Sequence, residues 1–153
     1  MATTPSSDGD SPSLGYLDDL VGYHLRRAVT VVGNDFSRAL AETGVRQVLF
    51  GILSIVGANP GINQGAVGRA LGIQRANMVS LINELVDRDL IDRATAEDDR
   101  RAFALNLTRA GKKITDECLT RIRAHEDELL SDLSEKERKI LIDLLGRIEA
   151  KEA

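Results

Sequence analysis

The sequence contains one cysteine, no tryptophan and few aromatic residues, which make up 3% of its 153 residues. A single cysteine excludes an internal disulfide, and the core has to be built from Leu, Ile, Val and Ala. No apolar run reaches the about 20 residues of a membrane-spanning helix. The opening MATTPSSDGDSPS has no basic start and no apolar stretch, so it is not typical of a secretory signal. We expect a cytoplasmic protein with one ordinary domain, or with one small domain and an accessory element.

Residues that carry enzyme or metal chemistry are also scarce. His24 and His125 are the only histidines, and no second cysteine accompanies Cys118, so a metal-ligand cluster is not expected. Cys118 falls at an apolar position of a predicted helix, which is typical of a core residue. The sequence shows no nucleophile–base pair and no glycine-rich phosphate loop. We therefore predict no catalytic residues, no metal site and no cofactor.

The net charge of −4 is distributed unevenly along the chain. Residues 69–113 hold 9 basic and 7 acidic side chains, whereas the segments before and after them are acidic on balance. A positive middle third points weakly to a polyanionic partner, because mixed charge is also typical of any solvated surface.

Helical periodicity dominates most of the chain. Apolar residues recur every three or four positions between residues 15 and 41, which predicts one long amphipathic helix. Residues 45–56 are nearly all apolar and are followed by a cluster of Gly, Asn and Pro, which is typical of a buried helix with a clear end. Two further long helices are predicted toward the C-terminus, capped by Thr108 and by Ser134 in a Ser-x-x-Glu capping box.

Two short helices with a tight turn lie in the positive segment. Asn63 caps the first, QGAVGRALG, and Gly72 ends it. The second has its apolar residues on one face and its polar residues on the other, a pattern that predicts a helix-turn-helix. An αα-hairpin with no DNA role explains this pattern equally well. The apolar face consists of Met78, Leu81, Ile82, Leu85 and Val86, and the polar face of Arg75, Asn77, Ser80, Asn83 and Glu84.

A β-hairpin is predicted next, because LIDRA and AFALNL read as short strands around the charged turn TAEDDRR. An isolated hairpin is marginal in water, so we expect it to pack on the helices through Phe103, Leu105 and Leu107. The result is a winged helix. Arginine at the tip suits a narrow minor groove, and we expect Asp99 to brace Arg101; a solvated turn is the alternative.

Several of these segments together resemble the MarR family of bacterial transcription regulators. The family's wing pattern, Asp-x-Arg, a short strand and Leu-Thr-x-x-Gly, is present in DDRRAFALNLTRAG. LGIQRANMVSLINELVDRDLIDR, NPGINQGAVGRALGI and GVRQVLFGIL resemble the neighbouring helices, so the resemblance covers about residues 15–150. It implies a mainly α fold with a small β-hairpin wing: a winged helix-turn-helix at residues 43–109 and a helical dimerisation region at 14–42 and 110–153. Residues 1–13 are predicted to be a disordered tail.

The resemblance also implies a homodimer that binds double-stranded DNA at a pseudo-palindromic operator. Glu84 departs from the family pattern, because many relatives carry basic residues where this chain has Ser80 and Glu84. A carboxylate there either repels the DNA backbone or accepts a hydrogen bond from a cytosine amino group. The predicted DNA-binding residues are Asn63, Gln64, Gln74, Arg75, Asn77, Val79, Ser80, Asn83, Arg93, Asp99, Arg100 and Arg101.

Relatives usually lose DNA affinity when a small aromatic effector binds, and LDDLVGYHLRRA resembles the first helix of relatives that respond to hydroxycinnamoyl-CoA thioesters. The predicted effector-binding residues are Tyr16, Tyr23, His24, Arg26 and Arg27; solvated or dimer-interface roles fit them equally well. We expect a transcriptional repressor. The alternative is a winged-helix module that binds protein and not DNA.

Overall fold

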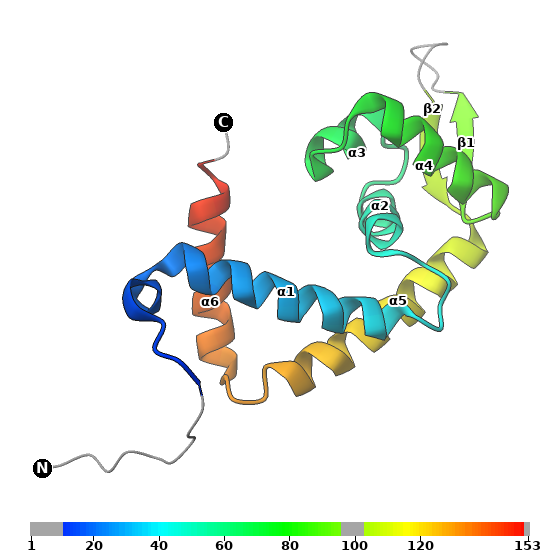
Figure 1. Cartoon of the computed structure of the whole chain (residues 1–153). Helices are drawn as coiled ribbons and strands as arrows, with labels where there is room; N and C mark the ends of the chain where they lie inside the picture. Colours follow the sequence, from blue (N-terminus) through cyan, green and yellow to red (C-terminus); the bar gives the residue numbers. More distant parts are fainter. Residues whose placement is uncertain (1–10, 96–102, 152–153) are drawn as a thin grey trace, which may run out of the picture. The chain divides into compact units, whose positions relative to one another are not determined.

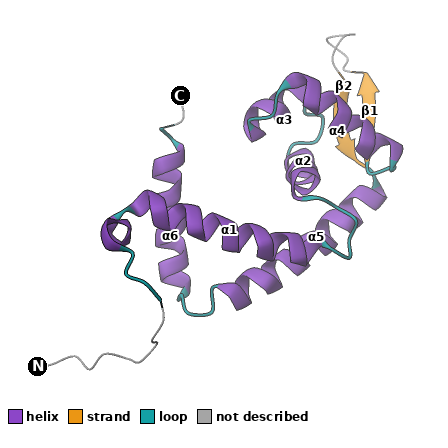
Figure 2. Cartoon of the chain, viewed as in Figure 1, coloured by secondary structure: helices purple, strands orange, loops and turns teal. Residues whose placement is uncertain are grey.

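The computed structural model of the protein describes residues 11–95 and 103–151. These residues form six α-helices, one short 3-10 helix and a two-stranded hairpin (Figures 1 and 2), so the prediction of a mainly α fold with a small hairpin is confirmed. The chain divides into two compact units, the first ending at Gly33 and the second starting at Asn34. The first ten residues of the predicted tail and the wing residues Asp99, Arg100 and Arg101 lie outside the described residues.

The helix predicted for residues 15–41 is interrupted near its start. A 3-10 helix, η1 (Gly15–Asp19), comes first, and Leu20 is extended, with φ −95° and ψ 109°. α1 (Val21–Leu40) begins only after it. The amide groups of Tyr23 and His24 donate to the Leu20 carbonyl oxygen, so Leu20 accepts the first hydrogen bonds of α1. The prediction of one continuous helix is therefore wrong. The apolar residues keep their spacing on both sides of Leu20, so the pattern does not reveal that this one residue has an extended backbone.

α2 (Gln47–Ala58) forms the centre of the core in the second unit. Leu49, Ile52, Leu53 and Val56 are fully buried, and the helix packs against α3, α5 and β2. Burying a side chain of this size stabilises the fold by about 1.5–3 kcal/mol. The run of apolar residues thus forms the buried helix that its composition predicts.

The helix-turn-helix consists of α3 (Gln64–Leu71) and α4 (Arg75–Asp87). The side chain of Asn63 accepts a hydrogen bond from the Ala66 amide at 2.8 Å, and Gly72 ends α3 in the left-handed region at φ +65°. The helices approach closely at Gly68, where an added Cβ would lie 2.9 Å from the Met78 side chain. The predicted caps and the tight turn are therefore confirmed.

β1 (Ile91–Thr95) pairs with β2 (Phe103–Leu107) in antiparallel register, with Arg93 opposite Leu105. Leu105 is fully buried and also pairs with Ile62, the residue before the cap of α3. This second pairing attaches the hairpin to the helix-turn-helix. Phe103 does not take part: it is 48% exposed, so its predicted packing against the helices is wrong. Leu105 enters the core, and the half-buried Leu107 packs against it, so these two predicted contacts are confirmed.

α5 (Arg109–Leu129) starts where the hairpin ends, and a clamp fixes the junction. The Thr108 hydroxyl accepts from the Gly111 amide at 2.9 Å and donates to the Asp89 carbonyl oxygen at 2.6 Å. A Cβ at Gly111 would lie 2.0 Å from the Leu90 carbonyl oxygen, so no side chain fits there. The Leu-Thr-x-x-Gly pattern therefore joins the wing to α5.

The last helix, α6 (Glu135–Glu149), starts at the predicted capping box. Glu137 accepts from the Ser134 amide, and this bond lowers the pKa of its carboxyl group. In contrast to α2 and α4, α6 has no buried residue. Among the described residues, no helix combines the length and the apolar character needed to cross a membrane.

Candidate nucleic-acid interface

The exposed face of α4 is the first part of the candidate interface. Met78, Ile82 and Leu85 are buried beneath the helix, which fixes its rotation about its own axis. The opposite face carries five of the predicted DNA-binding residues, all of them exposed. They are Arg75, Asn77, Val79, Ser80 and Asn83.

The starts of α3 and α4 hold three more predicted residues. Asn63 is exposed, but its side-chain oxygen is occupied by the cap of α3. Gln64 is half-buried in the first turn of that helix. Gln74 is exposed at the N-cap position of α4 and makes no side-chain cap bond there. Amide groups at a helix N-terminus favour an anion such as phosphate.

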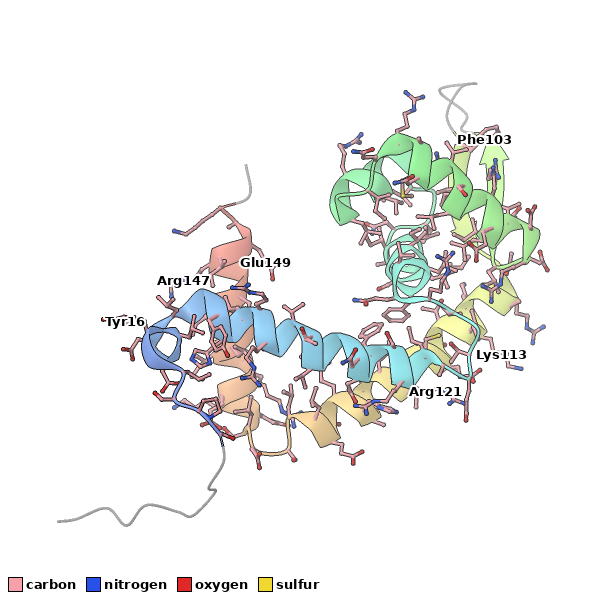
Figure 3. All side chains as sticks on the ribbon, viewed as in Figure 1. Tyr16, Phe103, Lys113, Arg121, Arg147 and Glu149 are labelled. Carbon is pink, nitrogen blue, oxygen red and sulfur yellow. The ribbon has the colours of Figure 1, made fainter. Side chains whose placement is uncertain are left out.

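Arg93 connects the hairpin to α4. Its guanidinium group donates a hydrogen bond to Oδ1 of Asn83 and lies 5.9 Å from the centre of the Phe103 ring, which Figure 3 labels at the end of the hairpin. Sequence reasoning placed both Arg93 and Asn83 at the interface but not in contact, because ten positions and a strand boundary separate them. The bond orients the Asn83 amide so that its NH₂ group points away from Arg93.

An ion-pair cluster that the sequence did not reveal flanks α4. Glu84 lies 2.5 Å from Arg46 Nη2 and 3.8 Å from Arg88 Nη1. Arg46, at the N-cap position of α2, and Glu84 line one groove of about 650 Å³ together with Gln74, Asn77 and Ser80. The only available signal for Arg46 was its place in GVRQVLFGIL, directly before the buried helix.

The wing residues Asp99, Arg100 and Arg101 lie outside the described residues, so the bracing of Arg101 by Asp99 stays a prediction. The described part of the hairpin nevertheless fixes where the tip starts, because Thr95 pairs with Phe103 at the end of the register.

An apolar pocket of about 500 Å³ lies elsewhere in the second unit. Phe36 and Phe50 meet edge to face in its wall, with ring centres 6.0 Å apart. Leu71 and Ile73 add apolar surface, and Gln47 adds one polar side chain. Ile73 also lines the groove beside α4, so this residue is shared by the pocket and the candidate interface.

Three of the five predicted effector residues come together in the first unit. Arg27 donates to the Tyr23 hydroxyl at 3.2 Å and lies 5.9 Å from the centre of its ring. His24 packs edge-on against Tyr23 and is held by the Asp18 carbonyl oxygen at 2.8 Å. Arg26 is exposed, and Tyr16, in η1, is 93% exposed. In the part of the chain that the structure describes, no side-chain hydrogen bond links Arg26 or Tyr16 to the group around Tyr23.

Buried Cys118, on α5, has the character predicted for it. Its side chain is part of the core, and burial raises the pKa of the thiol, which keeps it protonated and poorly nucleophilic. Within residues 11–95 and 103–151, no group of three or more His, Cys, Asp and Glu side chains is arranged to hold a metal ion.

Comparison with known proteins gives a consistent result. A profile of the MarR family matches residues 45–102. A Thauera aromatica protein, whose name assigns it to transcriptional regulation of the hcr operon, is 33% identical over 129 residues, 84% of this chain and 78% of its own. The repressor CouR bound to a 23-mer DNA duplex is 33% identical, with a TM-score of 0.85 over 92% of this chain and 99% of its own. CouR bound to p-coumaroyl-CoA is 32% identical, with a TM-score of 0.77 over 94% and 100%.

Proposed function

The chain belongs to the MarR family of transcriptional regulators, and from this premise we propose that it is a repressor that binds DNA as a homodimer and is released by a small aromatic effector. One observation supports DNA binding most directly. α4 exposes a row of polar side chains over a fully buried apolar base, as a helix inserted into the major groove requires.

The chemistry of the exposed face suits base recognition. Arginine pairs with the acceptors of guanine, and asparagine pairs with adenine, so Arg75 and Asn77 are the proposed base readers. Val79 is 46% exposed and offers a methyl surface for thymine. Arg93 orients Asn83 from the hairpin side. The wing residues Asp99, Arg100 and Arg101 complete the proposed interface at the adjacent minor groove and backbone.

Homodimer formation explains the exposed apolar residues of α6. MarR-family regulators are dimeric, and Ile140, Leu141, Leu144 and Ile148 are all exposed on this helix. A second copy would remove them from water. Two copies related by a two-fold axis present their α4 helices to half-sites about one helical turn apart, which implies a pseudo-palindromic operator.

The proposed effector is an aryl-CoA thioester, the class to which the p-coumaroyl-CoA bound by CouR belongs. Arg26 and Arg27 supply positive charge for its phosphates, and Tyr23 supplies an aromatic face in the same unit. Separately, the pocket walled by Phe36 and Phe50 offers apolar aromatic surface that suits a ring. An effector acts by stabilising a conformation in which the two α4 helices no longer match the half-sites.

DNA binding is tested with a duplex selected by the protein from a randomised library. Arg75→Ala is expected to weaken binding to the selected duplex roughly 10- to 100-fold and to relax the preference at one base pair. Arg121→Ala, on α5 (Figure 3), is the control, because it also removes an ion-paired arginine. Failure to select any duplex sequence would favour the protein-binding alternative.

Effector binding is tested by adding p-coumaroyl-CoA, free p-coumarate or free CoA to the complex with the selected duplex. The thioester is expected to release the DNA, and the two free components are expected to be much weaker. Arg27→Ala tests the first unit and Phe50→Ala tests the pocket, each by the thioester concentration needed for release. Retention of DNA by the wild-type protein at about 1 mM thioester would refute this effector class.

A further inference from the structure

Glu84 is the one acidic side chain on the groove-lining face of α4, where DNA is proposed to bind. Its two carboxylate oxygens face different arginines: Oε2 pairs with Arg46 Nη2 at 2.5 Å, and Oε1 lies 3.8 Å from Arg88 Nη1. The three side chains together carry a net charge of +1. The local field toward an approaching phosphate is therefore attractive, despite the carboxylate.

Arg46 comes from outside the helix-turn-helix. It stands at the N-cap position of α2, with an extended backbone, and reaches Glu84 across 38 positions of sequence. Its side chain is 60% exposed and lines the same groove as Gln74, Asn77 and Ser80. A guanidinium group has five N–H donors in a planar fork, so one carboxylate oxygen leaves most of that fork able to bind another anion.

We propose that Arg46 binds the DNA backbone beside α4 and that Glu84 is the positioning residue that holds it there. This inference rests on the proposed function. Contacts to phosphate fix the orientation of a protein on the duplex without reading its sequence. Arg46 in this role sets the depth and angle of α4 in the groove, and Arg88 neutralises the second oxygen of Glu84.

The test of Arg46 uses Arg46→Met, which keeps an aliphatic stem and removes the charge, beside the control Arg121→Met. Both the selected duplex and a duplex of scrambled sequence serve as probes. Arg46→Met is expected to weaken binding to both duplexes roughly tenfold and to lower the slope of log Kd against log salt concentration by about 1. Arg46→Lys is expected to keep the slope. Arg75→Ala, in contrast, affects mainly the selected duplex.

If Glu84 positions Arg46, the effect of Glu84→Ala on DNA affinity has opposite signs in the presence and in the absence of Arg46. In the wild-type background Glu84→Ala frees Arg46 and is expected to weaken binding about threefold. In the Arg46→Met background the same change only removes a negative charge, so it is expected to tighten binding. Circular dichroism of each variant confirms that the fold is retained, because exposed ion pairs contribute little to stability.

The outcomes separate this inference from the proposed function. If the wild-type protein binds neither duplex, the proposed function fails. If the wild-type protein binds and Arg46→Met behaves like Arg121→Met, Arg46 is not a backbone ligand. If Glu84→Ala tightens binding in both backgrounds, Glu84 is only a repulsive charge and its positioning role is refuted.

Discussion

α4 and α6 carry the same kind of amphipathic pattern, but the apolar residues of α4 are buried in the folded chain and those of α6 are exposed. Met78, Ile82 and Leu85 of α4 are at most 1% exposed, whereas Leu144, Ile140 and Ile148 of α6 are 45–48% exposed. Both helices have a clear local start: α4 follows the left-handed turn at Gly72, and α6 begins at a capping box. Local sequence therefore accounts for both helices but not for the difference between them.

The difference lies in the partner that each apolar stripe finds. The stripe of α4 packs within the second unit, in the core built around α2. The stripe of α6 has no buried residue within the described chain, which accords with the proposed homodimer. Apolar periodicity predicts that a stripe will be buried, but it does not say whether the covering surface belongs to the same chain.

The largest expected effect is at Gly111, a glycine of α5 that packs against the residue Leu90 after α4, and it is compared with a glycine of α6. Gly111→Ala would place a methyl group 2.0 Å from the Leu90 carbonyl oxygen, a backbone atom that cannot rotate away. We expect this variant to lose about 3 kcal/mol or more of stability in chemical unfolding. Gly146→Ala in α6 is the comparison, because its Cβ would meet no atom within 4 Å. It is expected to stabilise the helix by up to about 1 kcal/mol.

The outcome is informative in both directions. Equal stability of Gly111→Ala and the wild-type protein would mean that the junction between hairpin and α5 is looser than the Thr108 clamp indicates. A strong loss in Gly146→Ala would mean that another chain packs directly on that part of α6.

The next largest effect is the loss of stability when a leucine of α4 is truncated, compared with the truncation of a leucine of α6. Leu85→Ala removes a fully buried side chain and is expected to cost about 3 kcal/mol at any protein concentration. Leu144→Ala is expected to change the stability of a single subunit by less than about 1 kcal/mol and to raise the dimer dissociation constant roughly tenfold. Unfolding at several protein concentrations and analytical ultracentrifugation measure the two quantities.

The control in this comparison is the dependence on concentration. If Leu85→Ala and Leu144→Ala both act independently of protein concentration, α6 is not part of the dimer interface and the contrast between the helices has another origin.

The smallest effect concerns pH and the start of α6. The hydrogen bond from the Ser134 amide lowers the pKa of Glu137 from its ordinary 4.5, so the ionised form is the one that supports the cap. Its contribution is complete above pH 4.5 and is lost as the pH falls through the lower folded-state pKa. The stability difference between the wild-type protein and Glu137→Gln is therefore expected to shrink between pH 6 and about pH 3.

Thermal unfolding across this pH range measures the effect. Glu149→Gln, at the other end of α6, is the control, because it removes a carboxylate outside the capping box. A constant difference between the wild-type protein and Glu137→Gln at every pH would contradict the proposed link to ionisation.

Much of the fold was predictable because its signals are local. Asn63, Thr108 and Ser134 all cap the helices that their sequence patterns predicted, since a side-chain cap acts within three residues of its own position. The break at Leu20 and the exposure of Phe103 were not predicted. The exposure of Phe103 depends on how much space the folded core leaves, and a repeating apolar pattern carries no information about space. The break at Leu20 is a change in the backbone of one residue, which leaves the spacing of the apolar residues intact.

In the candidate site too, local features were predictable and contacts between distant residues were not. The exposed polar residues of α4 followed from a helical period, but the contacts of Arg93 with Asn83 and of Arg46 with Glu84 did not. Ten and 38 positions of sequence separate these partners, and the path of the chain between them decides whether they meet.

The amino-acid sequence by itself determined where helices begin and end, which face of each is apolar, and the family pattern around the hairpin. Only the tertiary structure decided which apolar stripes are covered, that Leu105 and not Phe103 enters the core, and that Glu84 is held between two arginines. Caps and periodicity depend on hydrogen bonds and geometry within a few residues, whereas burial and ion pairing depend on distances that exist only after distant segments pack together.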